Sequence, residues 1–224
     1  MLDMVGYPVP GAVKGSRKES NDVLRLTLKI NEYLKTQNCE VKLSRISDTN
    51  VSIDARTKEA NIWNADYFLS IHRNSSPSSV ASGDEIWIYS KAADSTYTKA
   101  LNILNAVNKV TGLANRGVKK GATSYKDYAV NRDTKMHASL LELGFISNNI
   151  DNIIFDTKFD EIALAIAKAL IENVGLKWID TIQSDNKNES LYKVQVGAFS
   201  DKKNADNLVT RLKNAGFSAI VVSE

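Results

Sequence analysis

The run Tyr67-Phe68-Leu69-Ser70-Ile71 is short, mostly apolar and followed directly by His72. Its length and composition predict a buried strand of the kind found in parallel sheets that helices cover on both sides. A second run, Ser139-Leu140-Leu141-Glu142-Leu143, has the same character and ends at Gly144. The first run thus places His72 at the carboxyl end of a buried strand, and the second places Glu142 inside a further candidate strand.

Helices and strands alternate on either side of these runs. Apolar periodicity predicts helices over 19–35, 52–63, 101–111 and 162–176, and β-branched and aromatic residues predict strands over 41–43 and 85–89. This order predicts an α/β fold, in which a mainly parallel mixed sheet is flanked by helices on both faces.

The composition changes near the carboxyl end. Residues 183–190 are all polar, which cannot support a core, and they predict a linker over 179–190 after a first domain at 1–178. Residues 191–224 then predict a small C-terminal β-α-β unit, with strands over 191–199 and 217–222 around a helix over 203–215. So short a unit buries little surface. We expect it to pack on the first domain, to form a dimer with another copy, or to be half of a larger module.

Charge and cysteine content exclude several classes of protein. The 29 basic and 26 acidic residues leave a net charge of +3, without a basic cluster, which argues against a nucleic-acid partner. The single cysteine, Cys39, excludes an intramolecular disulfide. No apolar run reaches the ~18 residues of a membrane span, and no signal peptide is visible at the start of the chain.

Three polar residues stand where an α/β sheet places its site, at strand ends and in the adjoining loops. They are Glu19, His72 and Glu142. On residues alone, a histidine after a strand is more often structural than a metal ligand. Glu142 is harder to explain in that way, because a buried carboxylate without a partner costs several kcal/mol. We therefore expect Glu142 to be functional or paired.

A series of short motifs follows the order and spacing of one family. The motifs are Pro10-Gly11-Ala12-Val13 with Gly15 and Glu19, Ser44-Arg45 with Asp48 and Arg56, Ala60-Asn61, Ala65-Asp66, and the segments 70–74, 116–118 and 142–148. Across residues 2–176 the chain thereby resembles the zinc-dependent N-acetylmuramoyl-L-alanine amidases. These enzymes cut the bond between N-acetylmuramic acid and L-alanine in bacterial peptidoglycan.

The resemblance implies a Zn²⁺ cofactor, held in the family by two histidines and one glutamate, with an open position for water. Carried over by motif, Glu19 and His72 are metal ligands. Glu142 matches the catalytic glutamate, which takes a proton from the zinc-activated water and passes it to the leaving amine. Arg73 and Asn74 lie beside His72 and are candidate substrate contacts, although a solvated loop explains them equally well.

The chain departs from the family at its first ligand, a histidine in a Gly-His-Gly segment before Pro10. Here that region reads Val5-Gly6-Tyr7-Pro8-Val9. Tyr7 is the candidate replacement, but a phenol with a pKa near ~10 is a weak zinc ligand unless the metal lowers that pKa. His137 is the other histidine of the chain and a poor substitute by position. We therefore expect reduced metal affinity or an inactive site.

The C-terminal stretch around Val194-Gln195-Val196-Gly197-Ala198-Phe199 resembles the opening half of a SPOR domain, a family that binds peptidoglycan glycan strands. An extension that merely caps the first domain is the alternative. The resemblances imply a peptidoglycan hydrolase that acts on glycan strands and stem peptides. Cell-wall lysis, mother-cell lysis in sporulation and phage endolysis are the roles we expect.

Without a visible leader, we expect accumulation in the cytoplasm and action on the cell wall after lysis or release. The competing hypothesis is a catalytically impaired wall-binding or regulatory protein that lost its first zinc ligand. A zinc peptidase or deaminase is disfavoured, because the chain has neither a His-Glu-x-x-His nor a paired cysteine motif.

Overall fold

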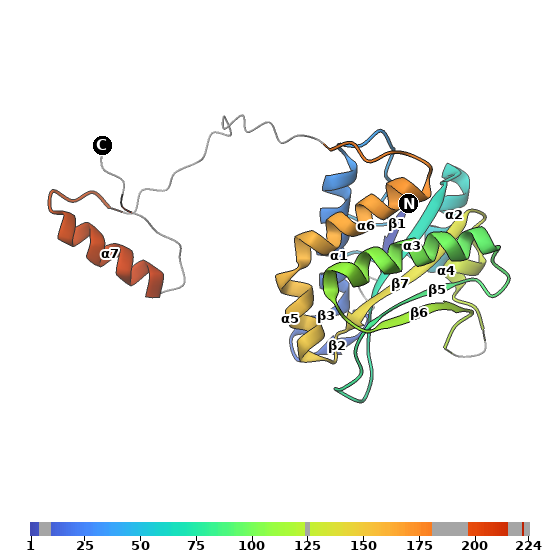
Figure 1. The fold of residues 1–224 in the computed structure, drawn as a ribbon, viewed down its shortest axis with the longest axis horizontal. Coiled ribbons are helices and arrows are strands. Elements are labelled where there is room, and N and C mark those ends of the chain that lie inside the picture. Colours follow the sequence, from blue (N-terminus) through green and yellow to red (C-terminus); the bar gives the residue numbers. More distant parts are fainter. Residues whose placement is uncertain (5–9, 124–125, 181–196, 215–220, 222–224) are drawn as a thin grey trace. The chain divides into compact units, whose positions relative to one another are not determined.

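The computed structural model describes residues 1–4, 10–123, 126–180, 197–214 and 221. The chain divides into two compact units, Met1–Asp180 and Thr181–Glu224, and each is described by itself. The first unit contains a five-stranded sheet with helices on both sides (Figure 1).

The sheet has the strand order β1-β4-β7-β5-β6. Its strands are β1 (Leu2–Met4), β4 (Tyr67–Asn74), β5 (Asp84–Ile88), β6 (Asn115–Lys120) and β7 (His137–Phe145). Strands β1, β4 and β7 run parallel, β5 runs antiparallel to β7, and β6 runs parallel to β5. The predicted mainly parallel mixed sheet is confirmed, and the two apolar runs form its neighbouring strands β4 and β7.

Helices cover the two faces of the sheet unequally. The larger core lies under α1 (Glu19–Leu34), α3 (Asp94–Thr111) and α6 (Phe159–Asn173), and we call this side the α1 face. A smaller core lies under α2 (Ile53–Trp63) and α4 (Ala129–Arg132), on the α2 face. Alternation along β4 sends Leu69 and Ile71 to the α1 face and Phe68 to the α2 face. By the same alternation Ser70 and His72 lie on the α2 face.

Several elements differ from the prediction. Residues 41–43 form no strand, because their backbone meets β1 in one isolated bridge, between Leu43 and Leu2. Strands β1 and β6 and helix α4 are short and lack a clear apolar period, so the sequence pattern did not predict them. The hairpin of β2 (Val13–Lys14) and β3 (Arg17–Lys18) and the helix α5 (Asn149–Thr157) were also not predicted.

The second unit contains α7 (Lys202–Asn214), at the position of the predicted C-terminal helix. The strands predicted over 191–199 and 217–222 fall mainly outside the described residues. The β-α-β arrangement and a dimer through it therefore stay predictions. Among the helices of the described ranges, none has the length and apolar character to cross a membrane.

Candidate active site

Three titratable side chains stand next to one another on the α2 face of the sheet. In the strand register, His72 of β4 is opposite Glu142 of β7, and Glu142 is opposite Glu85 of β5. Neighbouring strands lie about 4.8 Å apart, so the three residues form a continuous row across the sheet. We call His72, Glu142 and Glu85 the cross-strand row. It lies near the carboxyl ends of β4 and β7, where α/β folds place their sites.

Glu19 reaches this row from the first residue of α1. Its Oε1 lies 2.8 Å from His72 Nδ1 and accepts a hydrogen bond from the Arg73 backbone N–H at 3.2 Å. Its Oε2 accepts one from the Ala12 backbone N–H at 2.7 Å. Burial would raise the pKa of Glu19, but His72 and the two backbone donors hold that pKa below its usual value.

The Pro10-Gly11-Ala12-Val13 motif needs a glycine at position 11 for a steric reason. Gly11 has a φ of +69°, and a Cβ built on it would lie 2.2 Å from Glu19 Oε2. Only a residue without a side chain allows the carboxylate to lie against this turn. The turn and the helix start thus hold the Glu19 carboxylate beside His72.

The second ring nitrogen of His72, Nε2, contacts Ser70, which lies two residues earlier on the same face of β4. Ser70 Oγ lies 3.1 Å from His72 Nε2 and donates to the buried Asp3 carboxylate at 2.8 Å, and Asp3 also pairs with Arg56. Because Ser70 gives its one hydrogen to Asp3, it accepts from Nε2–H. Nδ1 is then the nitrogen that faces Glu19, and either a proton or a metal cation between Nδ1 and Oε1 satisfies both atoms.

The pKa of His72 is raised to about 9. Burial lowers this pKa, but the hydrogen bond and charge of Glu19 outweigh it, with smaller contributions from Glu142 and Asp3. His72 thus lies in a strongly negative environment, which favours a cation at this position.

Glu142 differs from Glu85, the other carboxylate of the row, because one of its buried oxygens has no partner within the described residues. Its Oε2 is buried and forms no hydrogen bond within the described residues. Burial raises the pKa of Glu142 to about 8; the charge of His72 acts against the rise, and the charges of Glu19 and Glu85 add to it. A buried acceptor without a partner is costly, and its presence here indicates that a ligand or water completes it.

Glu19 and His72 offer two of the three donors that the Zn²⁺ implied by the family resemblance requires. A carboxylate and an imidazole nitrogen are ordinary zinc donors, and Glu19 and His72 hold theirs side by side next to the unpartnered Glu142 oxygen. These residues fit the ion. In the part of the chain that the structure describes, no three His, Cys, Asp or Glu side chains converge on one metal position. Tyr7, the candidate third ligand, lies outside the described residues.

His137 does not supply the missing ligand in this arrangement. It pairs with Tyr67 at the opposite end of β4 and β7 from the His72–Glu142 pair. Five residues of strand separate His137 from Glu142, or about 17 Å. Its Nδ1 lies 2.7 Å from Thr96 Oγ1, and burial, with Lys99, lowers its pKa.

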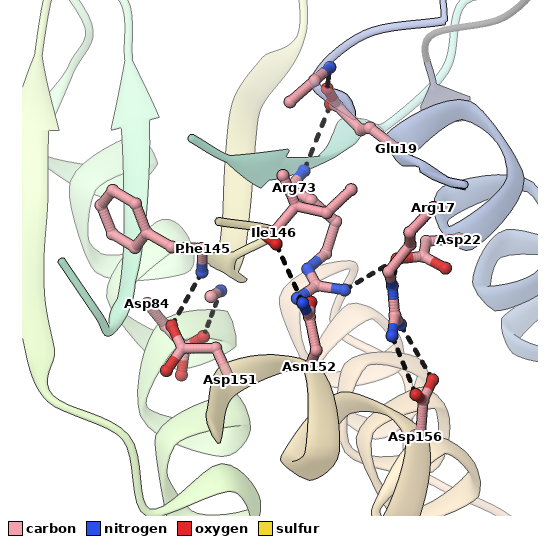
Figure 2. Close-up of polar contacts among 12 residues, drawn as sticks. Arg17, Glu19, Asp22, Arg73, Asp84, Phe145, Ile146, Asp151, Asn152 and Asp156 are labelled. Carbon is pink, nitrogen blue, oxygen red and sulfur yellow. Dashed lines mark hydrogen bonds and ion pairs between the residues drawn. The ribbon is translucent and has the colours of Figure 1, made fainter. Parts of the chain in front are cut away.

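The two candidate substrate contacts lie on opposite faces. Asn74 belongs to the α2 face, where its Nδ2 donates to Glu85 Oε1 at 3.0 Å. The Arg73 side chain lies on the α1 face and is 1% exposed. Its Nη1 donates to Asp22 at 2.8 Å and its Nη2 to Asn152 at 2.7 Å, as Figure 2 shows. The structure therefore does not bring the Arg73 guanidinium to the row, and we assign it to the framework that supports the site.

The segment that follows Glu142 is fixed by buried polar groups (Figure 2). The strand bulges there, and Gly144 adopts a φ of +60°. The Gly144 N–H donates to Asp84 and the Phe145 N–H donates to Asp151, both at 2.8 Å. Asn152 Nδ2 donates to the Ile146 carbonyl at 2.9 Å. These bonds hold the end of β7 against β5 and α5 and so keep Glu142 in register.

Sequence reasoning missed Asp3, Asp84, Glu85 and Asp151. Asp84 and Glu85 begin an apolar strand, and the argument that singled out Glu142, a carboxylate within a buried run, applies to them as well. Asp3 stands in a strand of three residues, which gave no pattern to read.

Comparison with known proteins identifies the family of the chain. Residues 5–172 match the family model of N-acetylmuramoyl-L-alanine amidase, and residues 163–223 match that of the SPOR domain. The SPOR match begins inside α6, which belongs to the first unit.

Two curated relatives and one solved structure extend the likeness. The N-acetylmuramoyl-L-alanine amidase CwlM of Bacillus licheniformis is 37% identical over 196 residues, which are 86% of this chain and 70% of the relative. The sporulation-specific N-acetylmuramoyl-L-alanine amidase of Bacillus subtilis (strain 168) is 34% identical over 217 residues, 95% of this chain and 79% of the relative.

The catalytic domain of CwlV, an N-acetylmuramoyl-L-alanine amidase from Bacillus (Paenibacillus) polymyxa var. colistinus, superimposes with a TM-score of 0.68 at 31% identity. The match covers 79% of this chain and 98% of that one. The chain therefore belongs to the N-acetylmuramoyl-L-alanine amidase family of peptidoglycan hydrolases.

Proposed function

We propose that the first unit hydrolyses the amide bond between N-acetylmuramic acid and L-alanine, with Glu142 as the general base. The observation that carries this proposal is the buried Glu142 Oε2, which forms no hydrogen bond within the described residues. Glu142 is opposite His72 in the cross-strand row, and His72 in turn pairs with Glu19. A general base needs an acceptor that no other group of the protein occupies.

Glu19 and His72 are the residues that would hold Zn²⁺. When bound, the ion supplies Lewis acidity, which polarises the amide carbonyl and makes a water molecule more acidic. The protein's own contribution is to fix the two ligands. Backbone donors from Ala12 and Arg73 hold the Glu19 carboxylate, and Ser70 orients the His72 ring. Tyr7 is proposed as a third ligand on sequence alone.

The proton follows a short path in this proposal. Glu142 accepts it from the attacking water as the oxygen bonds to the carbonyl carbon. Glu142 then delivers it to the nitrogen of L-alanine as the carbon–nitrogen bond breaks, so the products are a lactyl carboxylate and a free peptide amine. The buried position favours the protonated carboxyl between the two steps.

For the setting we propose wall lysis in sporulation, with the SPOR domain bound to glycan strands. Two findings support this role. Residues 163–223 match the SPOR domain model, and a relative named as sporulation-specific aligns with 95% of the chain.

A second candidate is a wall-binding protein with impaired catalysis. The observation that favours it is that the chain has two histidines, of which His137 lies at the far end of the sheet. One histidine and one glutamate bind zinc less tightly than a full set of three ligands.

Zinc content and product analysis distinguish the two candidates. We expect the protein, purified and equilibrated with excess Zn²⁺, to bind at most one ion per chain and to release L-alanine amino groups from a defined muramoyl peptide. If no zinc is bound at saturating Zn²⁺, the proposal that the protein is an active amidase is refuted. Wall binding without product, with hydrolysis gained in Tyr7→His, would favour the impaired protein.

A further inference from the structure

The Arg116-Gly117-Val118 motif lies on β6, away from the residues that act on the amide. Strand β6 pairs with β5 so that Asn115 is opposite Asp84, whereas Val118 is opposite Ile86. Two residues of β6 thus face one residue of β5, which is a bulge. Gly117, with a φ of +87°, takes the backbone conformation that this bulge requires.

The bulge has a consequence for two side chains. In an unbroken strand, residues three positions apart point to opposite faces. The extra residue brings Arg116 and Lys119 to the same face, where both bind Glu85: Arg116 Nε at 2.7 Å and Lys119 Nζ at 2.5 Å. We call these two residues the Arg116–Lys119 pair.

Glu85 anchors the pair and has no capacity left for another role. Its side chain is 4% exposed, and its Oε2 accepts from both cations. Its Oε1 accepts from Asn74 Nδ2 and Trp87 Nε1, each at 3.0 Å. Burial would raise the pKa of Glu85, but the hydrogen bonds from Lys119, Arg116 and Trp87 hold it below the usual value. Glu85 is therefore an ionised support and not a second base.

The pair carries more charge than Glu85 neutralises. Two cations share one carboxylate, and the Arg116 and Lys119 side chains are 38% and 32% exposed. Aromatic rings hold them in place: the Arg116 guanidinium carbon lies 5.0 Å from the Phe145 ring centroid, and Lys119 Nζ lies 5.1 Å from that of Trp87. A fixed, half-exposed positive charge is suited to bind an anion with little loss of side-chain entropy.

The position of the pair indicates which part of the substrate it meets. Glu19 and His72 lie on one side of Glu142, and β5 and β6 lie on the other. With the amide carbonyl toward Glu19 and His72, the leaving peptide runs toward β6. Arg116 Nε and Lys119 Nζ lie against Glu85 of β5, one strand spacing of about 5 Å from Glu142, and a peptide advances about 3.4 Å per residue. The pair thus lies one to two residues beyond the cleaved bond.

We propose that the Arg116–Lys119 pair is a specificity site that binds a carboxylate of the stem peptide beyond L-alanine. This inference rests on the proposed function, because the orientation of the peptide follows from the roles of Glu19, His72 and Glu142. A phosphate of an anionic wall polymer has related chemistry, but the reach from Glu142 favours a group on the substrate peptide itself.

Peptide binding tests the pair without turnover. The probes are two peptides that begin with L-alanine and differ at the second residue, which has a free carboxylate in one and a carboxamide in the other. Affinities are measured by NMR titration at constant ionic strength. We expect wild type to bind the carboxylate peptide at least about fivefold more tightly, and Lys119→Gln and Arg116→Gln to reduce this preference to less than about twofold.

Matched variants separate charge from folding. Lys120→Gln removes an exposed charge from the same strand and should keep the full preference. Lys119→Met keeps the contact with Trp87 and should lose the preference as Lys119→Gln does, at an unchanged melting temperature. Glycerol phosphate, added at the same concentration as the peptide, should not displace the carboxylate peptide from wild type.

Three outcomes would refute the proposed specificity site. They are equal affinity of wild type for the two peptides, a preference retained in both Lys119 variants, and displacement of the peptide by glycerol phosphate. These outcomes are distinct from a failure of the proposed function. A chain that discriminates the peptides but releases no L-alanine refutes the hydrolysis alone.

Discussion

His72 and Arg73 are neighbours in the chain, yet they lie on opposite faces of β4 and in opposite kinds of environment. The Arg73 side contains a buried guanidinium whose terminal nitrogens pair with Asp22 and Asn152 (Figure 2). The His72 side is partly exposed and borders the buried Glu142 oxygen, which has no partner within the described residues. Both sides are rich in charge. Charge alone therefore does not mark the site, and neither does a buried atom without a partner, since Arg73 Nε also forms no hydrogen bond within the described residues. The His72 side differs because its free acceptor lies next to the partly exposed pair of His72 and Glu19.

Glu142→Gln should produce the largest change on the His72 side. Loss of the general base is expected to lower amide hydrolysis by about 10²–10⁴-fold, while zinc binding stays within about threefold of wild type. Release of L-alanine amino groups and zinc content are the two measurements. Hydrolysis retained in Glu142→Gln would remove Glu142 from its proposed role.

Relative to wild type, the same variant should gain stability as the pH rises. The pKa of Glu142 is raised from 4.5 to about 8 in the folded protein, so the folded state holds this proton more tightly than the unfolded chain. Stability is therefore lost as pH rises from 4.5 toward 8. Glutamine removes that loss, and metal-free Glu142→Gln should exceed wild type at pH 8 by on the order of 4 kcal/mol and match it near pH 4.5. Denaturant unfolding checks this, with the exposed Glu161→Gln as the control.

Gly11→Ala tests whether the turn before α1 positions Glu19. A methyl group at Gly11 meets Glu19 Oε2, whereas Gly15, with a φ of +59°, has nothing within 4 Å of its Cβ position. Both alanine variants should lose about 1 kcal/mol of stability because of their left-handed backbone. Gly11→Ala alone should also weaken zinc binding and activity by about 100-fold. Equal metal affinity in the two variants would show that the turn does not position the ligand.

Ser70→Ala should have a smaller effect of the same kind. It removes the acceptor of His72 Nε2, and loss of such a support lowers metal affinity by about 10–100-fold. Ser139→Ala is the matched control, because Ser139 is a buried serine of β7 that bonds Tyr67 at 2.8 Å on the α1 face. A zinc titration that gives the same affinity for both variants would contradict the support by Ser70.

Asp22→Asn should affect the site least and the fold most. Asp22 pairs with Arg17 and Arg73 in a buried position, so the change leaves Arg73 poorly compensated at a cost of about 3 kcal/mol. Activity of the folded protein should change less than about twofold. Asp156→Asn, at a half-exposed carboxylate that also binds Arg17, should cost less than about 1 kcal/mol. A large fall in activity at full stability would place the Arg73 side within the site.

The sequence predicted the middle of the fold well, because β4 and β7 are apolar runs with few alternatives, and α1 and α3 have clear helical periods. It also predicted Glu19, His72 and Glu142, which the structure brings together. Arg73 was assigned to the substrate although alternation along β4 groups it with Leu69 and Ile71, so the signal was present. The position of Glu85 beside Glu142 could not be predicted, because no local sequence pattern indicates that β5 pairs with β7 in antiparallel orientation.

Digestion of purified peptidoglycan by the full chain at saturating zinc, with mass analysis of the products, tests the central claim most directly. We expect wild type to produce new L-alanine amino termini without new reducing sugar ends, and Glu142→Gln to produce no new amino termini. Reducing ends in place of amino termini, or the same products from wild type and Glu142→Gln, would contradict it.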